Sequence, residues 1–296
     1  MSYESQLLQF LISGVTVGAI YAIIALGFVM IYNVTNILNF AQGEFVMLGG
    51  MITVTTHDAG LPLIASAILA IAVTALIGAA MHRLAVRPAR NAPIIILIIV
   101  TLGISITIRG IALLVWGKYA FTLPGFTGDD PYFIGGAALM PQVIWVLGAT
   151  LLIVTALYLF FERTMRGKAF RAAAADGFAA RLMGISTDNI ALFSFAASAA
   201  MGAIAGVVVA PVTMTSYDIG IMLGLKGFVA AVFGGLTNPF AAIVAGFGLG
   251  IMESFGAGLI SSGYKDSIAL IVLLVALFIR AGGFMGRNEA QEGQPI

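Results

Sequence analysis

Nine apolar runs separated by short polar segments occupy almost the whole chain, and they constrain its fold more than any other feature. The runs are 7–31, 44–56, 63–84, 94–116, 142–161, 190–211, 220–236, 240–259 and 267–279. The 296 residues are 60% hydrophobic and 9% charged, with a mean hydropathy of +1.07, so a water-soluble core could not bury their apolar surface. The sequence therefore predicts an all-α, polytopic membrane protein, in which residues 1–286 form a single transmembrane domain.

The number of crossings follows from the lengths of the runs. Runs 44–56 and 220–236 are rich in glycine and short for a hydrocarbon core of roughly 30 Å. We expect these two helices to be short, broken or partly re-entrant, so the prediction is eight or nine transmembrane helices. The first run is too long for the apolar part of a signal peptide and follows no Lys or Arg, which indicates a retained helix.

The basic residues predict an orientation. They cluster after the third, fifth and ninth runs, as Arg83, Arg87 and Arg90, as five residues of the loop 162–188, and as Arg280 and Arg287. Nine crossings put all three clusters on one side, which the positive-inside rule makes the cytoplasmic side. The N-terminus and the loop 116–141 then lie outside, and the C-terminus lies inside. In the outer loop Gly135-Gly136 predicts a hairpin, and the polar tail 287–296 is expected to be disordered.

The loop 162–188 combines positive charge with a helical pattern. Five of the 14 Lys and Arg residues lie in it: Arg163, Arg166, Lys168, Arg171 and Arg181. One helical stripe holds Phe170, Ala174, Phe178 and Leu182, whereas Lys168, Arg171, Asp176 and Arg181 occupy other faces. An amphipathic helix presented to the cytoplasm is either a docking surface for a partner or an anchor on the lipid surface.

A weak internal repeat relates the two halves of the chain. Gly14-x-x-x-Gly18 in the first run corresponds to Gly202-x-x-x-Gly206 in the sixth, and Phe45-Val46 corresponds to Phe228-Val229. In the predicted topology the two halves are inverted, which is typical of transport proteins whose pathway lies between the halves. The alternative interpretation of each glycine pair is close helix packing.

Motifs for catalysis are missing from the sequence. It contains no G-x-x-x-x-G-K-[ST], H-E-x-x-H or G-x-S-x-G, and the absence of cysteine excludes disulfides and thiolate metal sites. Few ionisable residues fall within the runs. Glu44 either faces a cavity or partner, or caps the next helix at headgroup level. Lys226 is expected to snorkel to the interface, and Arg109 and Glu253 are expected to have structural roles there.

The segment YAIIALGFVMIYNVTNILNFAQGEFVMLGG resembles the N-terminal signature of LivH-type permeases, the membrane subunits of branched-chain amino-acid ABC importers. RGKAFRAAAADGFAARLMGI, LKGFVAAVFGGLTNPFAAIVAGFGLGIMES and ALFIRAGGFMG continue the resemblance in order. It implies an inverted-repeat permease in the inner membrane of a bacterium, with a periplasmic N-terminus and alternating access. The implied partners are a second permease, two cytoplasmic ATPase subunits, a periplasmic binding protein and membrane lipid, with no nucleic acid. ATP and Mg would be bound by the ATPases, and this chain would hold no cofactor.

Candidate pathway residues lie at the junction of the first two runs and at a roughly corresponding place in the second half, beside Phe228-Val229. The translocation pathway is expected to involve Asn39, Gln42, Gly43, Glu44 and Lys226. The family often has His in NFAHGEF where this chain has Gln42, a departure compatible with a different solute. Two alternatives stay open: an ion-coupled secondary transporter, and a related permease that carries amides, urea or aromatic solutes.

ABC permeases carry a loop motif similar to E-A-A-x-x-x-G that contacts the ATPase, and residues 178–184 fill it here. Phe178 stands where an acidic residue is usual, so no salt bridge to the ATPase is expected from this position. Ala179 and Ala180 would permit close approach, and Gly184 would end the helix. The expected coupling residues are Arg171, Asp176, Phe178, Ala179, Ala180, Arg181, Leu182 and Gly184.

Overall fold

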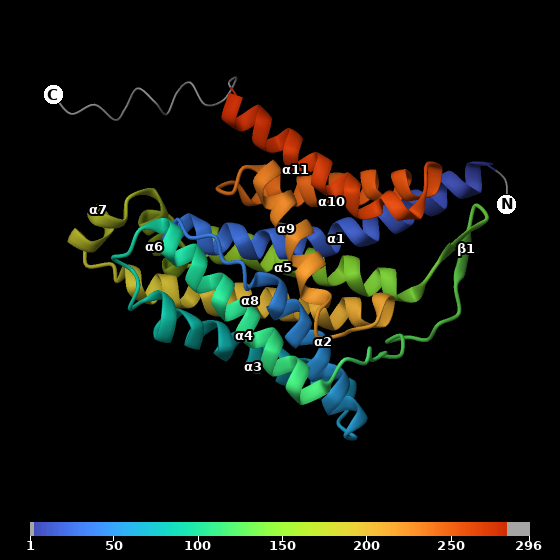
Figure 1. The fold of residues 1–296 in the computed structure, drawn as a ribbon, viewed down its shortest axis with the longest axis horizontal. Coiled ribbons are helices and arrows are strands. Elements are labelled where there is room, and N and C mark those ends of the chain that lie inside the picture. Colours follow the sequence, from blue (N-terminus) through green and yellow to red (C-terminus); the bar gives the residue numbers. More distant parts are fainter. Residues whose placement is uncertain (1–2, 283–296) are drawn as a thin grey trace.

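The computed structural model describes residues 3–282, and every one of the nine apolar runs forms a helix in it (Figure 1). The elements are α1 (Tyr3–Thr35), α2 (Gln42–Asp58), α3 (Leu63–Met81), the π-helical turn η1 (His82–Val86), α4 (Ile94–Trp116), β1 (Tyr132–Ile134), β2 (Ala137–Leu139), α5 (Pro141–Arg163), α6 (Met165–Ala175), α7 (Gly177–Leu182), α8 (Thr187–Thr213), α9 (Ile219–Gly234), α10 (Pro239–Leu259), the 3-10 turn η2 (Ser262–Tyr264) and α11 (Lys265–Gly282). The predicted tail 287–296 lies outside the described residues.

Helix lengths agree with a polytopic membrane protein. Within residues 3–282, six helices are long and apolar enough to cross a membrane: α1, α3 with η1, α4, α5, α8 and α10. The two runs expected to give short helices do so, since α2 has 17 residues and α9 has 16. The total of eight or nine crossings stays a prediction.

α1 forms the centre of the bundle. All of its residues from Gly18 to Ile31 are buried, and Figure 1 shows it passing between α3 and α4 on one side and α10 and α11 on the other. α1 packs on α9 and α10, and α8 packs on α2 and α3. Inverted halves would give this arrangement, because the first helix of each half would contact the second and third helices of the other. The repeat itself stays a prediction.

Both glycine pairs serve close helix packing. A Cβ atom on Gly14 would lie 2.7 Å from the Cα of Ile251 in α10, and one on Gly18 would lie 2.7 Å from the Cα of Phe247. In the second pair, a Cβ atom on Gly202 would lie 2.8 Å from the Cβ of Phe45 in α2, and one on Gly206 would overlap the carbonyl oxygen of Val46. The packing interpretation of these motifs is therefore confirmed, because a methyl group at either position in α1 would separate the two backbones.

Contacts between connecting segments define one end of the bundle. Nε of Arg87, after η1, lies 3.2 Å from the carboxylate of Asp188 at the start of α8. The amide of Asn33, near the end of α1, donates to the carbonyl of Thr237 between α9 and α10 at 3.2 Å. The first and second basic clusters therefore lie at the same end, as the predicted topology requires.

The opposite end contains the outer loop. Phe121 and Thr215 exchange two backbone hydrogen bonds of 2.8 Å. The predicted hairpin is confirmed as β1 and β2, joined by Gly135-Gly136 with φ of 56° and 82°, values that favour glycine. The backbone nitrogen of Ala138 donates to the side chain of Gln9 in α1 at 2.8 Å. Which of the two ends faces the cytoplasm stays a prediction.

Candidate functional site

The segment between α1 and α2 holds most of the predicted pathway residues. Asn39 is fully buried, and its Oδ1 accepts a hydrogen bond from the backbone nitrogen of Ala41 at 3.0 Å. Its amide nitrogen has no hydrogen-bond partner among the described residues. Asn39 therefore shapes the entry into α2 from inside the bundle.

Gln42 connects three helices. Its Nε2 donates to the carbonyl of Ser198 in α8 at 3.2 Å, and its Oε1 lies 2.6 Å from the Ser198 hydroxyl. That hydroxyl also lies 2.9 Å from the carbonyl of Gly27 in α1. Because a buried amide needs such partners, the structure gives Gln42 a role in holding α2 against α1 and α8.

Gly43 lies where α2 crosses α9 in backbone contact. A Cβ atom on Gly43 would overlap the carbonyl oxygen of Gly220 and lie 2.9 Å from the Cα of Gly224. In the other direction, a Cβ atom on Gly220 would lie 2.6 Å from the carbonyl oxygen of Gly43. Three glycines thus bring the backbones of α2 and α9 together, and a side chain at Gly43 would separate them.

Glu44, the next residue, lines a cavity of about 280 Å³ beside this crossing. Glu44 is only 2% exposed, and its Oε1 accepts a hydrogen bond from Ser105 of α4 at 2.8 Å. Its Oε2 is buried without a hydrogen-bond partner among residues 3–282. Glu44 lies in the first turn of α2 and also lines the cavity, so the cavity-facing interpretation agrees with the structure.

The rest of the cavity wall is mostly apolar and aromatic. The ring of Phe228 lies 5.7 Å from that of Phe28 and 5.5 Å from that of Phe40, measured between centroids. Arg109 of α4 also lines the cavity. A carboxylate and aromatic rings suit an ammonium group, and a guanidinium suits a carboxylate. The lining therefore suits a small zwitterion that carries an apolar side chain.

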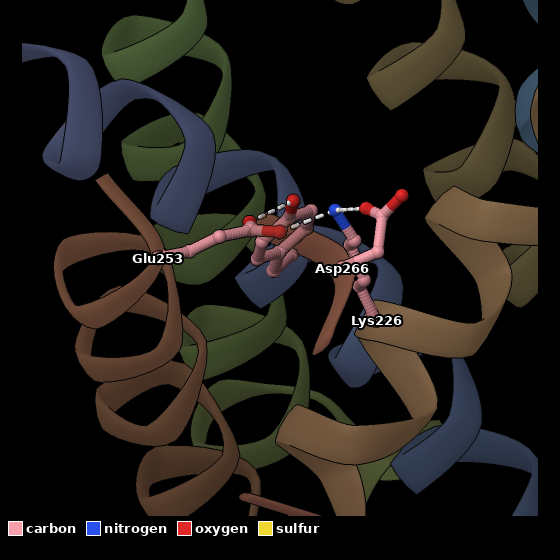
Figure 2. A network of polar contacts seen from close by, with 4 residues as sticks. Lys226, Glu253 and Asp266 are labelled. Carbon is pink, nitrogen blue, oxygen red and sulfur yellow. Dashed lines mark hydrogen bonds and ion pairs between the residues drawn. The ribbon is translucent and has the colours of Figure 1, made fainter. Parts of the chain in front are cut away.

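Lys226 does not join this cavity. Its ammonium group pairs with the carboxylate of Glu253 in α10 and, at 2.7 Å, with Asp266 at the start of α11 (Figure 2). The hydroxyl of Tyr21 in α1 donates to the other oxygen of Glu253 at 2.5 Å. Lys226 and Glu253 are both buried. The expected structural role of Glu253 agrees with this ion pair, and the depth of Lys226 and Glu253 relative to the membrane interface stays a prediction.

Sequence reasoning missed this network and the contact between Ser105 and Glu44. A signal for the network existed, because two opposite charges inside apolar runs each need a partner in a membrane protein. The sequence did not indicate that the partners would be each other, since α9 and α10 pack side by side only in the fold. The hydroxyl groups of Tyr21 and Ser105 carried no signal of their own.

The predicted coupling loop forms two helices, so the expectation of one continuous stripe is wrong. Asp176 ends α6 and caps α7, and its Oδ1 accepts from the backbone nitrogens of Phe178 and Ala179 at 2.8 and 2.9 Å. A capping Asp satisfies the free N–H groups of a new helix, which explains why the chain breaks there. Phe170 of α6 is buried, whereas Phe178 lies exposed on α7.

α7 presents a small apolar surface. The side chains of Phe178 and Leu182 are four residues apart and are 67% and 74% exposed, and Ala179 is exposed beside them. Ala180 is instead buried against its own chain. Gly184 has φ of +80°, so it ends the helix as predicted.

The coupling loop's two predicted arginines lie in different surroundings. Arg171 forms an ion pair with Glu162 at 2.6 Å, which connects α6 to the end of α5. Arg181 is exposed and lines a second cavity, at the end of the bundle. The structure therefore assigns Arg171 to contacts within the chain and leaves Arg181 accessible.

Comparison with known proteins identifies the family. The profile of the family described as branched-chain amino acid transport system / permease component matches residues 10–277. The chain is 33% identical over 302 residues to the high-affinity branched-chain amino acid transport system permease protein LivH of Escherichia coli (strain K12), covering 96% of this chain and 97% of LivH. It is 32% identical over 299 residues to the corresponding protein BraD of Pseudomonas aeruginosa, covering 96% and 97%.

Among solved structures, PsaBC from Streptococcus pneumoniae in complex with Fab aligns with 93% of this chain and 91% of its own, at a TM-score of 0.46 and 15% identity. The family assignment depends on the sequence matches, which extend over nearly the full length of both chains. Together with the apolar helices, they establish a membrane protein. The chain belongs to the family of branched-chain amino acid transport system permease components.

Proposed function

We propose that this chain is the membrane-spanning permease subunit of a bacterial ABC importer for branched-chain or related hydrophobic amino acids. The observation that carries the proposal is the family match over residues 10–277, whose curated relatives LivH and BraD are named as branched-chain amino acid permeases. Specificity would rest mainly with a periplasmic binding protein that delivers the solute. The N-terminus would then be periplasmic, and the C-terminus and α7 cytoplasmic.

The cavity at Glu44 supports a solute with an ammonium group. One oxygen of the carboxylate accepts no hydrogen bond from the described part of the chain, and aromatic rings line the cavity beside it, which suits the charged nitrogen of an amino acid. Urea and simple amides carry no such charge and would gain less from a buried carboxylate. An amino acid with an apolar side chain is therefore the favoured solute class among those that related permeases carry.

α7 would transmit the ATPase cycle to the membrane. Its exposed apolar pair, Phe178 and Leu182, would enter a cleft of one of two cytoplasmic ATPase subunits, and a second permease would complete the complex. ATP would close the ATPase dimer and move α7, and the paired permeases would rearrange to expose the pathway to the other side. Burial of two apolar side chains would stabilise such docking more than exposed charges would.

Reconstitution tests the proposal. The permease is assembled with its partner subunits in proteoliposomes that hold ATP, the binding protein is added outside, and uptake of radiolabelled leucine, isoleucine and valine is measured. We expect uptake that requires both ATP and the binding protein. Vesicles with an ATPase subunit that cannot hydrolyse ATP are the control. Equal uptake by these vesicles would contradict an ATP-driven importer.

One observation favours a second candidate, an ion-coupled transporter. Lys226 and Glu253 form a buried ion pair, which the half-exposed Asp266 extends, and ionisable groups inside membrane proteins often belong to ion or proton pathways. Uptake that persists without ATP and collapses when an uncoupler removes the ion gradient would support this candidate. Uptake that requires ATP and tolerates the uncoupler would exclude it.

A further inference from the structure

A second cavity, of about 650 Å³, lies at the end of the bundle that holds the basic clusters. It is enclosed by the end of α1, by η1, and by α7 with the start of α8. Figure 1 shows α7 at the same end of the bundle as the connection from α3 to α4. Among the described residues, this cavity shares no lining residue with the cavity at Glu44, so it is a separate candidate site.

The rim of the cavity carries both signs of charge. Arg87, Arg90 and Arg181 line it, and so does Asp188. Asp188 pairs with Arg87 at 3.2 Å, whereas Arg90 and Arg181 form no ion pair among the described residues. Two guanidinium groups are therefore available to a carboxylate, and one acidic group lies within the same cavity for an ammonium.

The local backbone is unusual at this point. α3 ends in the π-helical turn η1, and the backbone nitrogen of Arg87 closes that turn by donating to the carbonyl of His82 at 2.8 Å. π-helical turns are rare and occur frequently at functional sites. On the facing side, the Ser186 hydroxyl caps α8 by accepting from the nitrogen of Asn189. The charged groups are thus carried by ordered turns on both sides of the cavity.

The floor of the cavity is apolar and belongs to the interior of the bundle. Ile37, Val86 and Leu97 line it and are buried, and so is His82, whose ring packs on Phe195 at 5.4 Å between centroids. The Nδ1 atom of His82 is buried without a hydrogen-bond partner in the described part of the chain. A charged rim above an apolar floor suits a small amphiphile, because an inorganic anion would gain nothing from the floor.

We propose that this cavity is a regulatory site for the free cytoplasmic form of the carried amino acid. The carboxylate would bind Arg90 and Arg181, the ammonium would bind Asp188, and the apolar side chain would cover the floor. This inference rests on the proposed function for the class of solute. Since Gly177 and Arg181 belong to α7, an occupant ties α7 to η1 and α8. It thereby resists movement of α7 and slows transport when the cytoplasm is already supplied.

Direct binding tests the site without transport. The assembled complex, carrying Glu44→Gln to weaken the first cavity, is incubated with tritiated leucine in the absence of binding protein and ATP. We expect binding that Arg90→Gln weakens by about tenfold, the effect of losing one charge-assisted hydrogen bond. Arg83→Gln is the matched control, because Arg83 is exposed in the same basic cluster and does not line the cavity. Equal binding by both variants, or none in the parent, would overturn the proposal.

Regulation is tested with the wild-type complex in nanodiscs. ATP hydrolysis driven by saturating loaded binding protein is measured while free leucine is raised past about 1 mM, a concentration that fills a weak site. We expect ATP hydrolysis to slow at least twofold. The Arg90→Gln complex should require about tenfold more leucine for the same inhibition. Inhibition by phosphate or by 4-methylpentanoate, which lacks the ammonium group, equal to that by leucine would overturn a zwitterion site. Failure of the proposed function would appear separately, as absent leucine uptake with leucine binding retained.

Discussion

The ammonium group of Lys226 and the carboxylate of Glu253 form an ion pair whose side chains are only 7% and 0% exposed. Asp266 completes the contact from the start of α11, and its side chain is 55% exposed. The contacts therefore connect α9, α10 and α11, and Tyr21 extends them to the central helix α1. A buried pair contributes little net stability compared with apolar residues, but loss of one partner leaves an uncompensated charge.

Stability should respond asymmetrically to loss of the two partners. Lys226→Met leaves Glu253 charged and buried with the Tyr21 hydroxyl as its one remaining partner among the described residues, so we expect a loss of about 3–5 kcal/mol. Glu253→Gln should cost less, because Lys226 keeps Asp266 and the new amide can still accept from Tyr21. Thermal unfolding in detergent, followed by tryptophan fluorescence, measures the difference.

The double variant is the control for this ranking. Lys226→Met with Glu253→Gln removes both buried charges and should be more stable than Lys226→Met alone, because no unpaired carboxylate is left. Additive losses in the double variant would mean that the two residues contribute separately. The ion pair would then not be the reason for their burial.

Close contact between α2 and α9 should make Gly43 intolerant of even a methyl group. Gly43→Ala places a Cβ atom against the Gly220 carbonyl, and we expect a loss of about 1–3 kcal/mol from overpacking together with reduced uptake. Gly103→Ala is the matched control, because a Cβ there meets no described residue within 4 Å and alanine favours a helix by up to about 1 kcal/mol. Equal unfolding temperatures for the two variants would contradict the crossing geometry.

Uptake should depend on the charge of Glu44. Glu44→Gln keeps the size of the side chain and a hydrogen-bond acceptor for Ser105, but it removes the negative charge that would attract an ammonium group. We expect uptake of leucine to fall about tenfold or more, with copurification of the partner subunits unchanged. Glu4→Gln, at an exposed position of α1, is the control. Uptake by Glu44→Gln at the wild-type rate would show that the carboxylate is not part of the pathway.

The lengths of the apolar runs, and the polar and glycine residues that separate them, predicted the helices, because a chain segment in lipid has few alternative backbone structures. Each run had to form a helix to satisfy its backbone, and Gly135-Gly136 marked the hairpin by its need for positive φ. The break at Asp176 was missed, because Phe170 and Phe178 fit one helical stripe in the sequence. Whether an Asp caps a new helix or occupies the polar face of one helix is decided by the packing on both sides of it.

The candidate site was predicted in part. Glu44 was identified because a carboxylate inside apolar sequence is rare, and Gly43 because it lies beside Glu44 at the same helix junction. Lys226 was placed with them by its position in the repeat, but α9 has two faces, and Gly220 takes the face toward α2. The partners of Lys226 come from α10 and α11. Such long-range pairing depends on helix rotation, which a single sequence does not specify.

Orientation can be tested by labelling, because the chain has no cysteine. Met165→Cys, in α6, and Tyr119→Cys, in the outer loop, both introduce thiols at exposed positions. In intact cells a membrane-impermeant maleimide should label Tyr119→Cys, and it should label Met165→Cys only after the membrane is opened. The positive-inside rule is the physical reason, since three basic clusters follow the ends predicted to be cytoplasmic. Labelling of Met165→Cys in intact cells would show that the orientation is the reverse of the predicted one and that α7 does not contact the ATPase.

Docking through α7 should depend on its apolar pair more than on its charges. Leu182→Glu puts a charge into the proposed contact, and we expect loss of the copurifying ATPase or of ATP-coupled uptake, with the permease still inserted. Met165→Glu is the matched control, because Met165 is equally exposed and lies on α6. Arg181→Gln should have a smaller effect on copurification, since exposed ion pairs contribute at most about 1 kcal/mol.

Substitutions of Gly184, which ends α7, can distinguish an effect on ATPase docking from an effect on helix stability. Gly184→Asn should be tolerated, because asparagine adopts positive φ more readily than other side chains, whereas Gly184→Val should strain the turn by about 1–3 kcal/mol. No described residue lies within 4 Å of a Cβ atom at this position, so backbone strain is the only penalty within residues 3–282. If α7 must keep its direction to reach the ATPase, only the valine variant should uncouple hydrolysis from uptake. Equal coupling in both variants would mean that the ATPase does not bind at this turn.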